Sequence, residues 1–235
     1  MTSGVDAAGV DVADVDVALE TSRREASLAL GVGASLFTDE LGARAHASDL
    51  LARLATLLER AGVERRAGRL ALGAVYVGLG PGSYTGLRVG IATAQALARA
   101  SGAALYGLPS FEALAFAEFR SGEEGAVALD ARADRFYHAR YRRTAHGLVV
   151  LEAPAALSAP ELARACARPG RVLGHEGLAE VAGLALERAH LCTDARPSAR
   201  ALLELGRARQ AAGELTPALA LEPLYLQIFG RAERS

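Results

Sequence analysis

The sequence predicts an α/β protein built from two duplicated lobes. The first observation is a strand–glycine loop–helix unit, VYVGLGPGSYTGLRVGIATAQALARA, at residues 75–100. The second is a repeat, in which VALETSRREASLAL begins at Val17 and VALDARADRFYHARY begins at Val127. Each copy reads as a strand ending in a carboxylate, Glu20 or Asp130, then an arginine-bearing turn and an alternating strand. A strand hairpin followed by helices, occurring twice, is typical of two α/β lobes packed side by side.

The elements of the first lobe follow in order. Alternating strands are predicted at residues 15–19 and 27–32, joined by the polar turn ETSRRE. Apolar residues at helical spacing then predict an amphipathic helix that stops at Gly62: Leu50, Leu54, Leu57, Leu58 and Ala61. Residues 72–77 form a third strand, which feeds the glycine loop and its helix. AALYGLPSFEALAFAEF predicts a short strand, a turn and a further helix that starts near Ser110.

The second lobe begins with the second hairpin. After it, SAPELARACA predicts a helix, RVLGHEG a strand with a turn, and SARALLELGRARQAAG a helix, whereas the tail LEPLYLQIFGRAERS has no periodic element. We therefore expect an acidic, partly disordered lead-in at residues 1–14, a first α/β lobe at 15–106 and a second at 107–235. Since no linker rich in Pro, Gly or Ser separates the lobes, we expect them to be contiguous.

Composition excludes several kinds of chemistry. The net charge is −1, so the chain as a whole is not strongly basic. All 26 basic residues are arginine, so no Schiff base, lysine base or P-loop lysine can form. Cys166 and Cys192 form no CxxC pair, which suits a reducing cytoplasm and gives neither a disulfide framework nor a zinc site. No apolar run is long enough for a membrane span, and the amino terminus lacks the pattern of a secretory signal.

The glycine loop matches no phosphate-binding pattern closely. Leu87 follows Gly86 where a Walker loop needs lysine, and the glycines miss the spacing of a dinucleotide fingerprint. The residues around Ser83 also differ from the G-x-S-x-G nucleophile elbow. We interpret Ser83 or Thr85 as a helix cap. A Ser83-dependent hydrolase or protease, or an ATP-binding protein of the sugar-kinase kind, remains as the alternative.

The helix after the loop carries a ridge of minimal side chains. Gly86, Gly90, Ala94 and Ala98 recur every four residues. Glycine inside a helix costs about 1 kcal/mol relative to alanine, so two of them need a compensating close approach by another backbone. The ridge is therefore predicted to be a packing surface, either inside the chain or between chains.

At GPGSYTGLRVGIATAQALA the sequence resembles the TsaB (YeaZ) family, the accessory subunits in bacterial synthesis of threonylcarbamoyladenosine at position 37 of tRNA. Further matching stretches are LETSRREASLAL, HASDLLARLATLL, LPSFEAL, LDARADRFYHARY and EPLYL, and residues 15–145 carry most of the likeness. The resemblance implies an actin-like/Hsp70-like (ASKHA) fold of two duplicated lobes. It also implies a cytoplasmic protein with no catalytic residue, metal or cofactor of its own.

The resemblance further implies partners. They are the catalytic subunit TsaD, the ATPase TsaE and, through the complex, tRNA, with no role for a membrane; for the chain alone, both a homodimer and a monomer are left open. The sequence departs from the family at Glu20, where the family carries Asp, and in the turn at residues 21–24, which lacks a glycine. Both departures disfavour ATP binding in this lobe.

By this analogy the helix over residues 85–98, together with the helix over 46–58, forms the dimerisation face. The implied interface residues are His46, Leu50, Leu54, Thr85, Gly86, Leu87, Arg88, Gly90, Ile91, Ala94, Gln95 and Ala98. The implied structural loop is Gly80, Pro81, Gly82 and Ser83. A cluster of arginines in the second hairpin predicts either contact with tRNA or a strand edge protected from aggregation: Arg132, Arg135, Arg140, Arg142 and Arg143.

Overall fold

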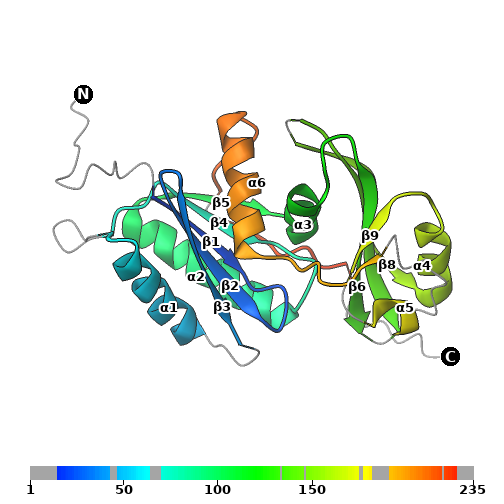
Figure 1. Cartoon of the computed structure of the whole chain (residues 1–235). Helices are drawn as coiled ribbons and strands as arrows, with labels where there is room; N and C mark the ends of the chain where they lie inside the picture. Colours follow the sequence, from blue (N-terminus) through cyan, green and yellow to red (C-terminus); the bar gives the residue numbers. More distant parts are fainter. Residues whose placement is uncertain are drawn as a thin grey trace. The chain divides into compact units, whose positions relative to one another are not determined.

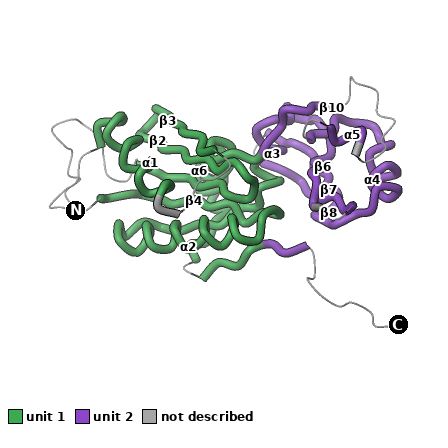
Figure 2. The backbone as a smooth tube through the Cα atoms, turned by 90° about the horizontal axis from the view of Figure 1, so that it is seen from below, with its two compact units in different colours: residues 1–113, 197–223 green, residues 114–196, 224–235 purple. Residues whose placement is uncertain are grey.

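The computed structural model describes residues 15–42, 47–63, 70–132, 134–145, 147–174, 177–181, 191–218 and 220–226. The acidic lead-in and His46 lie outside these ranges. The chain divides into two compact units (Figure 2), of which unit 1 comprises Met1–Ala113 and Pro197–Pro223 and unit 2 comprises Leu114–Arg196 and Leu224–Ser235. The sequence division at residue 106 placed the segment 197–223 in the second lobe, whereas the structure places it in unit 1.

Unit 1 contains a five-stranded sheet in the order β3-β2-β1-β4-β5. The strand β1 pairs antiparallel with β2 and parallel with β4, and β4 pairs parallel with β5. Its elements are β1 (Val15–Glu20), β2 (Ala26–Val32), β3 (Ser35–Leu41), α1 (Ala47–Arg60), β4 (Ala74–Gly78), α2 (Tyr84–Ser101), β5 (Ala104–Leu108), the start of α3 (Ser110–Glu118), and α6 (Ala199–Ala211).

Unit 2 repeats this topology in its sheet, whose order is β10-β9-β6-β7-β8. In both sheets the first three strands in the chain form an antiparallel meander. On its other side the first strand pairs parallel with a fourth strand, which pairs parallel with a fifth. The duplication predicted from the hairpin repeat is thereby confirmed. The elements are β6 (Glu124–Arg132), β7 (Arg135–Arg143), β8 (Leu148–Ser158), α4 (Ala159–Cys166), β9 (Arg171–Leu173), α5 (Leu178–Val181) and β10 (Leu191–Cys192).

Two helices cover one face of the unit 1 sheet. The helices α1 and α2 lie side by side there, and α6 covers the other face (Figure 1). The leucines that predicted α1 are buried against the sheet, including Leu50, Leu54 and Leu57. Since full burial of a leucine contributes about 1.5–3 kcal/mol, this apolar stripe accounts for the position of α1 on the sheet.

The helix α6 is fixed to the opposite face by polar contacts as well as packing. Arg207 donates to Asp16 Oδ2 at 2.7 Å and to the carbonyl oxygen of Gly33 at 2.8 Å. The Tyr76 hydroxyl donates to Gln210. The Tyr76 ring stacks on the Tyr106 ring. It also lies against Gly206, so a Cβ added to Gly206 would overlap the Tyr76 ring. These contacts are the reason that the segment 197–223 belongs to unit 1.

Unit 2 has its own apolar core between its sheet and α4, which includes Phe136, Leu162 and Val172. Ser158 and Glu161 form a capping box at the start of α4. Burial raises the pKa of the free thiol of Cys166 to about 11, which leaves it protonated at neutral pH. Among the residues that the structure describes, no helix is both long enough and apolar enough to span a bilayer.

Candidate functional site

The glycine loop is held by the turn that follows β1. Because β1 and β4 are parallel neighbours, their carboxyl ends meet at one edge of the sheet. The Ser83 N–H donates to the carbonyl oxygen of Ser22 at 2.6 Å. A Cβ on Gly82 would overlap the backbone of Ser22, so the loop approaches the turn closely enough to require glycine at that position. The glycine loop after β4 and the turn after β1 are therefore held together at this edge of the sheet.

Ser83 caps α2, as the sequence predicted. Its Oγ accepts the N–H of Gly86 at 3.2 Å, and its backbone is extended at the cap. A serine nucleophile would need a base within hydrogen-bond reach of its Oγ, whereas the hydrogen bond described for Ser83 Oγ is the one to the backbone of α2. The geometry therefore supports a capping role for Ser83.

The ridge of small residues packs inside unit 1. A Cβ on Gly86 would overlap the carbonyl oxygen of Thr21, and one on Gly90 would overlap Thr21 Oγ1. Ala94 and Ala98 belong to the apolar core, with exposed fractions of 0% and 2%. Of the two possibilities left open by the sequence, the structure shows the internal one. The close approach that the glycines require is made by the chain's own β1–β2 turn.

Most residues of the expected interface are consequently unavailable to a partner. Those buried within unit 1 are Leu50, Leu54, Leu87, Gly90, Ile91, Ala94 and Ala98. Thr85 and Arg88 are exposed, Gly86 and Gln95 are half-buried, and His46 lies outside the described residues. The residues of α1 and α2 that remain accessible lie on the outer sides of these two helices.

Those outer sides carry residues that the sequence reasoning missed. Leu51 on α1 is 48% exposed and Tyr84 on α2 is 41% exposed. The Arg88 guanidinium lies over the Tyr84 ring, 4.2 Å from its centroid, and Ala92 and Ala96 continue the exposed side of α2. The exposure of Leu51 could have been predicted from the sequence. Leu51 directly follows Leu50, and successive residues of a helix point in different directions, so Leu51 lies outside the buried leucine stripe of α1.

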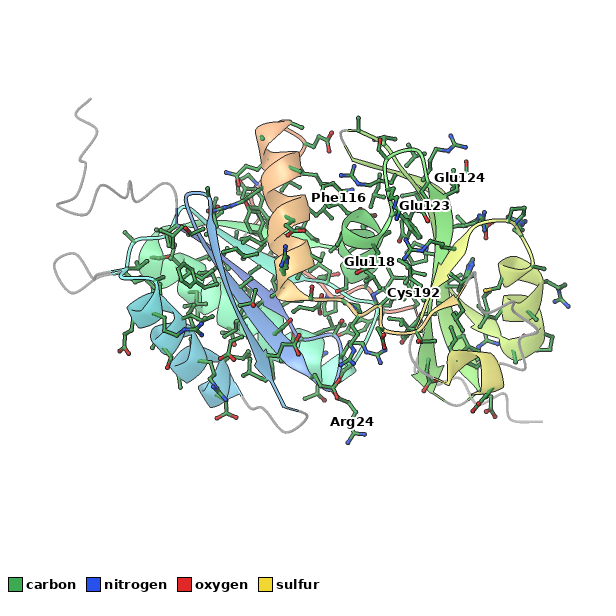
Figure 3. The ribbon with its side chains drawn as sticks, in the orientation of Figure 1. Arg24, Phe116, Glu118, Glu123, Glu124 and Cys192 are labelled. Atoms are coloured by element: carbon green, nitrogen blue, oxygen red, sulfur yellow. The ribbon has the colours of Figure 1, made fainter. Side chains whose placement is uncertain are left out.

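A buried polar cluster lies where β1 ends. Glu20 is 1% exposed, and its Oε1 accepts the N–H of Ser22 at 2.7 Å. Burial raises the pKa of the Glu20 carboxyl, against the smaller effects of hydrogen bonds from Ser110, Ser22 and Thr21. Arg24, at the tip of the same turn, points away from the ribbon instead (Figure 3). In the part of the chain that the structure describes, no group of three or more metal-ligating side chains is arranged to hold an ion.

Comparison with known proteins decides the family. Residues 38–192, which make up more than half of the chain, match the family described as "TsaD: tRNA N6-adenosine threonylcarbamoyltransferase". The chain is 30% identical to TsaB of Escherichia coli over 148 residues and 33% identical to TsaB of Haemophilus influenzae over 129 residues. The chain belongs to this family, on its TsaB (YeaZ) branch. The two matches span 62% and 53% of those relatives' lengths, and 62% and 54% of this chain.

Solved structures agree with the TsaB assignment. YeaZ from Pseudomonas aeruginosa is 29% identical and superposes with a TM-score of 0.76, covering 91% of this chain and 100% of that chain. A second structure from the same organism, described as similar to peptidase YEAZ, is 28% identical with a TM-score of 0.75. The fold is therefore that of YeaZ, and the repeated sheet topology confirms the two-lobed ASKHA fold.

The arginines of the second hairpin have local roles in this TsaB-family chain. Arg135 and Arg140 donate to backbone carbonyl oxygens, Arg142 pairs with Glu124, and Arg143 lies 3.8 Å from the centroid of the Phe116 ring. Glu124 and Phe116 are labelled in Figure 3. The side chain of Arg132 lies outside the described residues. Arg132 is the last residue of β6, and the other four arginines are on β7. Because β7 lies between β6 and β8 in the sheet, it is not an edge strand, and the predicted role in protecting a strand edge is wrong.

The buried imidazole of His138 should make unit 2 less stable in acid. Its Nδ1 lies 3.9 Å from Glu152 Oε2, and burial, followed by Arg140 and Arg168, lowers its pKa to about 4. Because the unfolded chain takes up this proton near pH 6.5, the stability of unit 2 should fall by about 3 kcal/mol as pH drops from 6.5 to 4. Denaturant unfolding of the wild type and His138→Leu at both pH values measures this. Equal acid losses in the two proteins would contradict it.

Proposed function

We propose that this TsaB-family chain is a non-catalytic, cytoplasmic partner subunit of a TsaD transferase. In this role it supports the threonylcarbamoylation of adenosine 37 in tRNA. The proposal is supported by the TsaB relatives, which are named as tRNA threonylcarbamoyladenosine biosynthesis proteins, and by the family match over residues 38–192. TsaE, tRNA held through the complex, and a second copy of the chain when TsaD is absent complete the proposed partners.

The single observation that carries the pairing is the exposed side of α1 and α2. The exposed residues of these two neighbouring helices include a large apolar side chain on α1, Leu51, an aromatic–arginine pair on α2, Tyr84 and Arg88, and two small residues on α2, Ala92 and Ala96. Aromatic and arginine side chains are enriched where interfaces carry most of their binding energy. Small residues let a partner's helices approach, and a specific interface buries at least about 1,000 Å² in total.

The glycine loop supports a role without bond-making chemistry in this chain. Ser83 Oγ is engaged by Gly86, the Ser83 N–H by Ser22, and the Gly80 N–H by Ser110 Oγ at 3.1 Å. Groups that satisfy one another in this way hold a loop in place. They are not preorganised around a reacting atom, as catalytic groups must be.

The test is co-expression with a TsaD subunit, followed by sizing and a threonylcarbamoylation assay with and without this chain. The expected result is a stable complex of the two chains, with transfer to tRNA that depends on both. Full transfer by TsaD and its donor-forming enzymes in the absence of this chain would contradict the proposal. Ester or peptide hydrolysis that is lost in Ser83→Ala would favour the hydrolase alternative, and micromolar binding of ATP with magnesium would favour the sugar-kinase alternative.

A further inference from the structure

The carboxyl group of Glu20 is enclosed by uncharged groups. Its Oε1 accepts the Ser22 N–H at 2.7 Å, whereas its Oε2 is fully buried and lacks a partner of good hydrogen-bond geometry. The groups that face it come from the turn after β1, from β4 and from α3. They are Ser22 and Thr21, the backbone of Gly78, and the hydroxyl of Ser110, none of which carries a charge.

Ser110 is positioned to connect this carboxyl group to the glycine loop. A Cβ placed on Gly78 would overlap both Glu20 Oε2 and Ser110 Oγ, so the two oxygens lie over the same backbone atom. Ser110 Oγ also accepts the N–H of Gly80, and the Ser110 N–H donates to the carbonyl oxygen of Gly80 at 2.9 Å. A serine hydroxyl has two acceptor lone pairs, so Ser110 Oγ has one left for a second donor.

A carboxylate in this place would be a buried charge with no cation beside it, and the hydrogen bonds from Ser22, Thr21 and Ser110 offset less than burial costs. Such a group takes up a proton in preference to remaining charged. A proton on Oε2 removes the buried charge and makes this atom a donor. Burial as the leading cause of the raised pKa of Glu20 agrees with this.

We propose that Glu20 is a neutral carboxylic acid in the folded protein and that its Oε2–H donates to Ser110 Oγ. This bond joins the end of β1 to the start of α3 and, through Gly80, to the loop that ends at the α2 cap Ser83. Glu20 is thus a positioning residue for α2. Its consequence for pairing rests on the proposed function, since α2 carries part of the partner face.

The duplicated fold supplies a matched control. Asp130 occupies the corresponding sequence position near the end of β6 in unit 2, but its side chain is exposed. Water can reach that side chain, so the argument from burial does not extend to it. Asp130→Asn is therefore the control for the loss of a carboxyl group that is not buried.

The protonation state is tested directly by NMR of the full chain with ¹³C-labelled glutamate side chains. The Glu20 signal is assigned by its loss in Glu20→Gln. We expect it to keep the chemical shift of the protonated acid at about pH 6, where exposed glutamates with a pKa near 4.3 are ionised. A Glu20 signal that titrates together with those of the exposed glutamates would overturn the proposal, whether or not the chain pairs with TsaD.

The positioning role is tested by pairing and stability. Glu20→Gln keeps a donor at this site, so its affinity for a TsaD subunit should stay within about twofold of the wild type, whereas Glu20→Ala should lose about tenfold or more. The wild type should lose stability as pH rises above the ordinary carboxyl range, and Glu20→Gln should lose less. Wild-type affinity for TsaD in Glu20→Ala would overturn the role, as would an equal loss of stability with rising pH in the wild type and Glu20→Gln. If Glu20→Ala does not fold, the comparison of stability against pH decides.

Discussion

Gly90→Trp is expected to unfold unit 1. Gly90 is buried in the middle of α2, and even a Cβ at this position would overlap Thr21 Oγ1. An indole there has no space unless α2 leaves the sheet, so the loss should exceed about 4 kcal/mol, the range that marks a disrupted core. Denaturant unfolding and the hydrogen exchange of β1 amides would measure this.

Gly90→Ala makes the same argument with a single methyl group. Alanine is favoured over glycine in a helix by about 1 kcal/mol, so an unobstructed site would be stabilised. We expect destabilisation instead, and partial recovery when Thr21→Ala removes the overlapping oxygen in a double-mutant cycle. Ala92→Trp, on the exposed side of α2, is the matched control and should fold normally. A stabilised Gly90→Ala would show that the ridge is open.

A chain that ends at Arg196 is expected to lose the fold of unit 1. It lacks α6, whose Leu202, Leu203 and Leu205 are each no more than 2% exposed. At about 1.5–3 kcal/mol for each buried leucine, their loss approaches the 5–15 kcal/mol by which domains are stable. The truncation also removes the ion pair between Arg207 on α6 and Asp16 on β1.

The readout is the hydrogen exchange of amides in β1 and β2. The matched control is a chain that ends at Pro223, which keeps α6 and the segment where the Ala218 N–H donates to the carbonyl oxygen of Leu105. Unit 1 should keep its slow exchange in that control. Protection of β1 in the chain ending at Arg196 would show that unit 1 folds without its returning segment.

Local patterns predicted the elements of the fold better than its long-range organisation. The hairpin repeat and the leucine stripe of α1 depend on spacing within a few residues, and both are confirmed. The strands β3 and β8 were missed, because SLFTDEL has only partial alternation and LVVLEAPAALS contains a proline. The return of α6 to unit 1 depends on contacts such as Arg207 with Asp16, separated by 191 residues, which no local pattern reveals.

The candidate site was predicted in part for the same reason. The sequence correctly required a close approach to Gly86 and Gly90, but the direction of that approach depends on how α2 rotates against the sheet. That rotation is fixed by tertiary packing with the β1–β2 turn, which contributes Thr21. Helical spacing shows which residues share a face, and it does not show which of two faces is covered.

The most direct test of the account is the affinity of folded surface variants for a TsaD subunit, measured by titration calorimetry. The account predicts that Leu51→Asp and Ala92→Trp unfold like the wild type but bind at least about tenfold more weakly, a loss of about 1.4 kcal/mol each. Arg200→Glu, which is 65% exposed on α6, should bind as the wild type does. Wild-type affinity in both Leu51→Asp and Ala92→Trp would contradict the claim that the outer sides of α1 and α2 receive the partner.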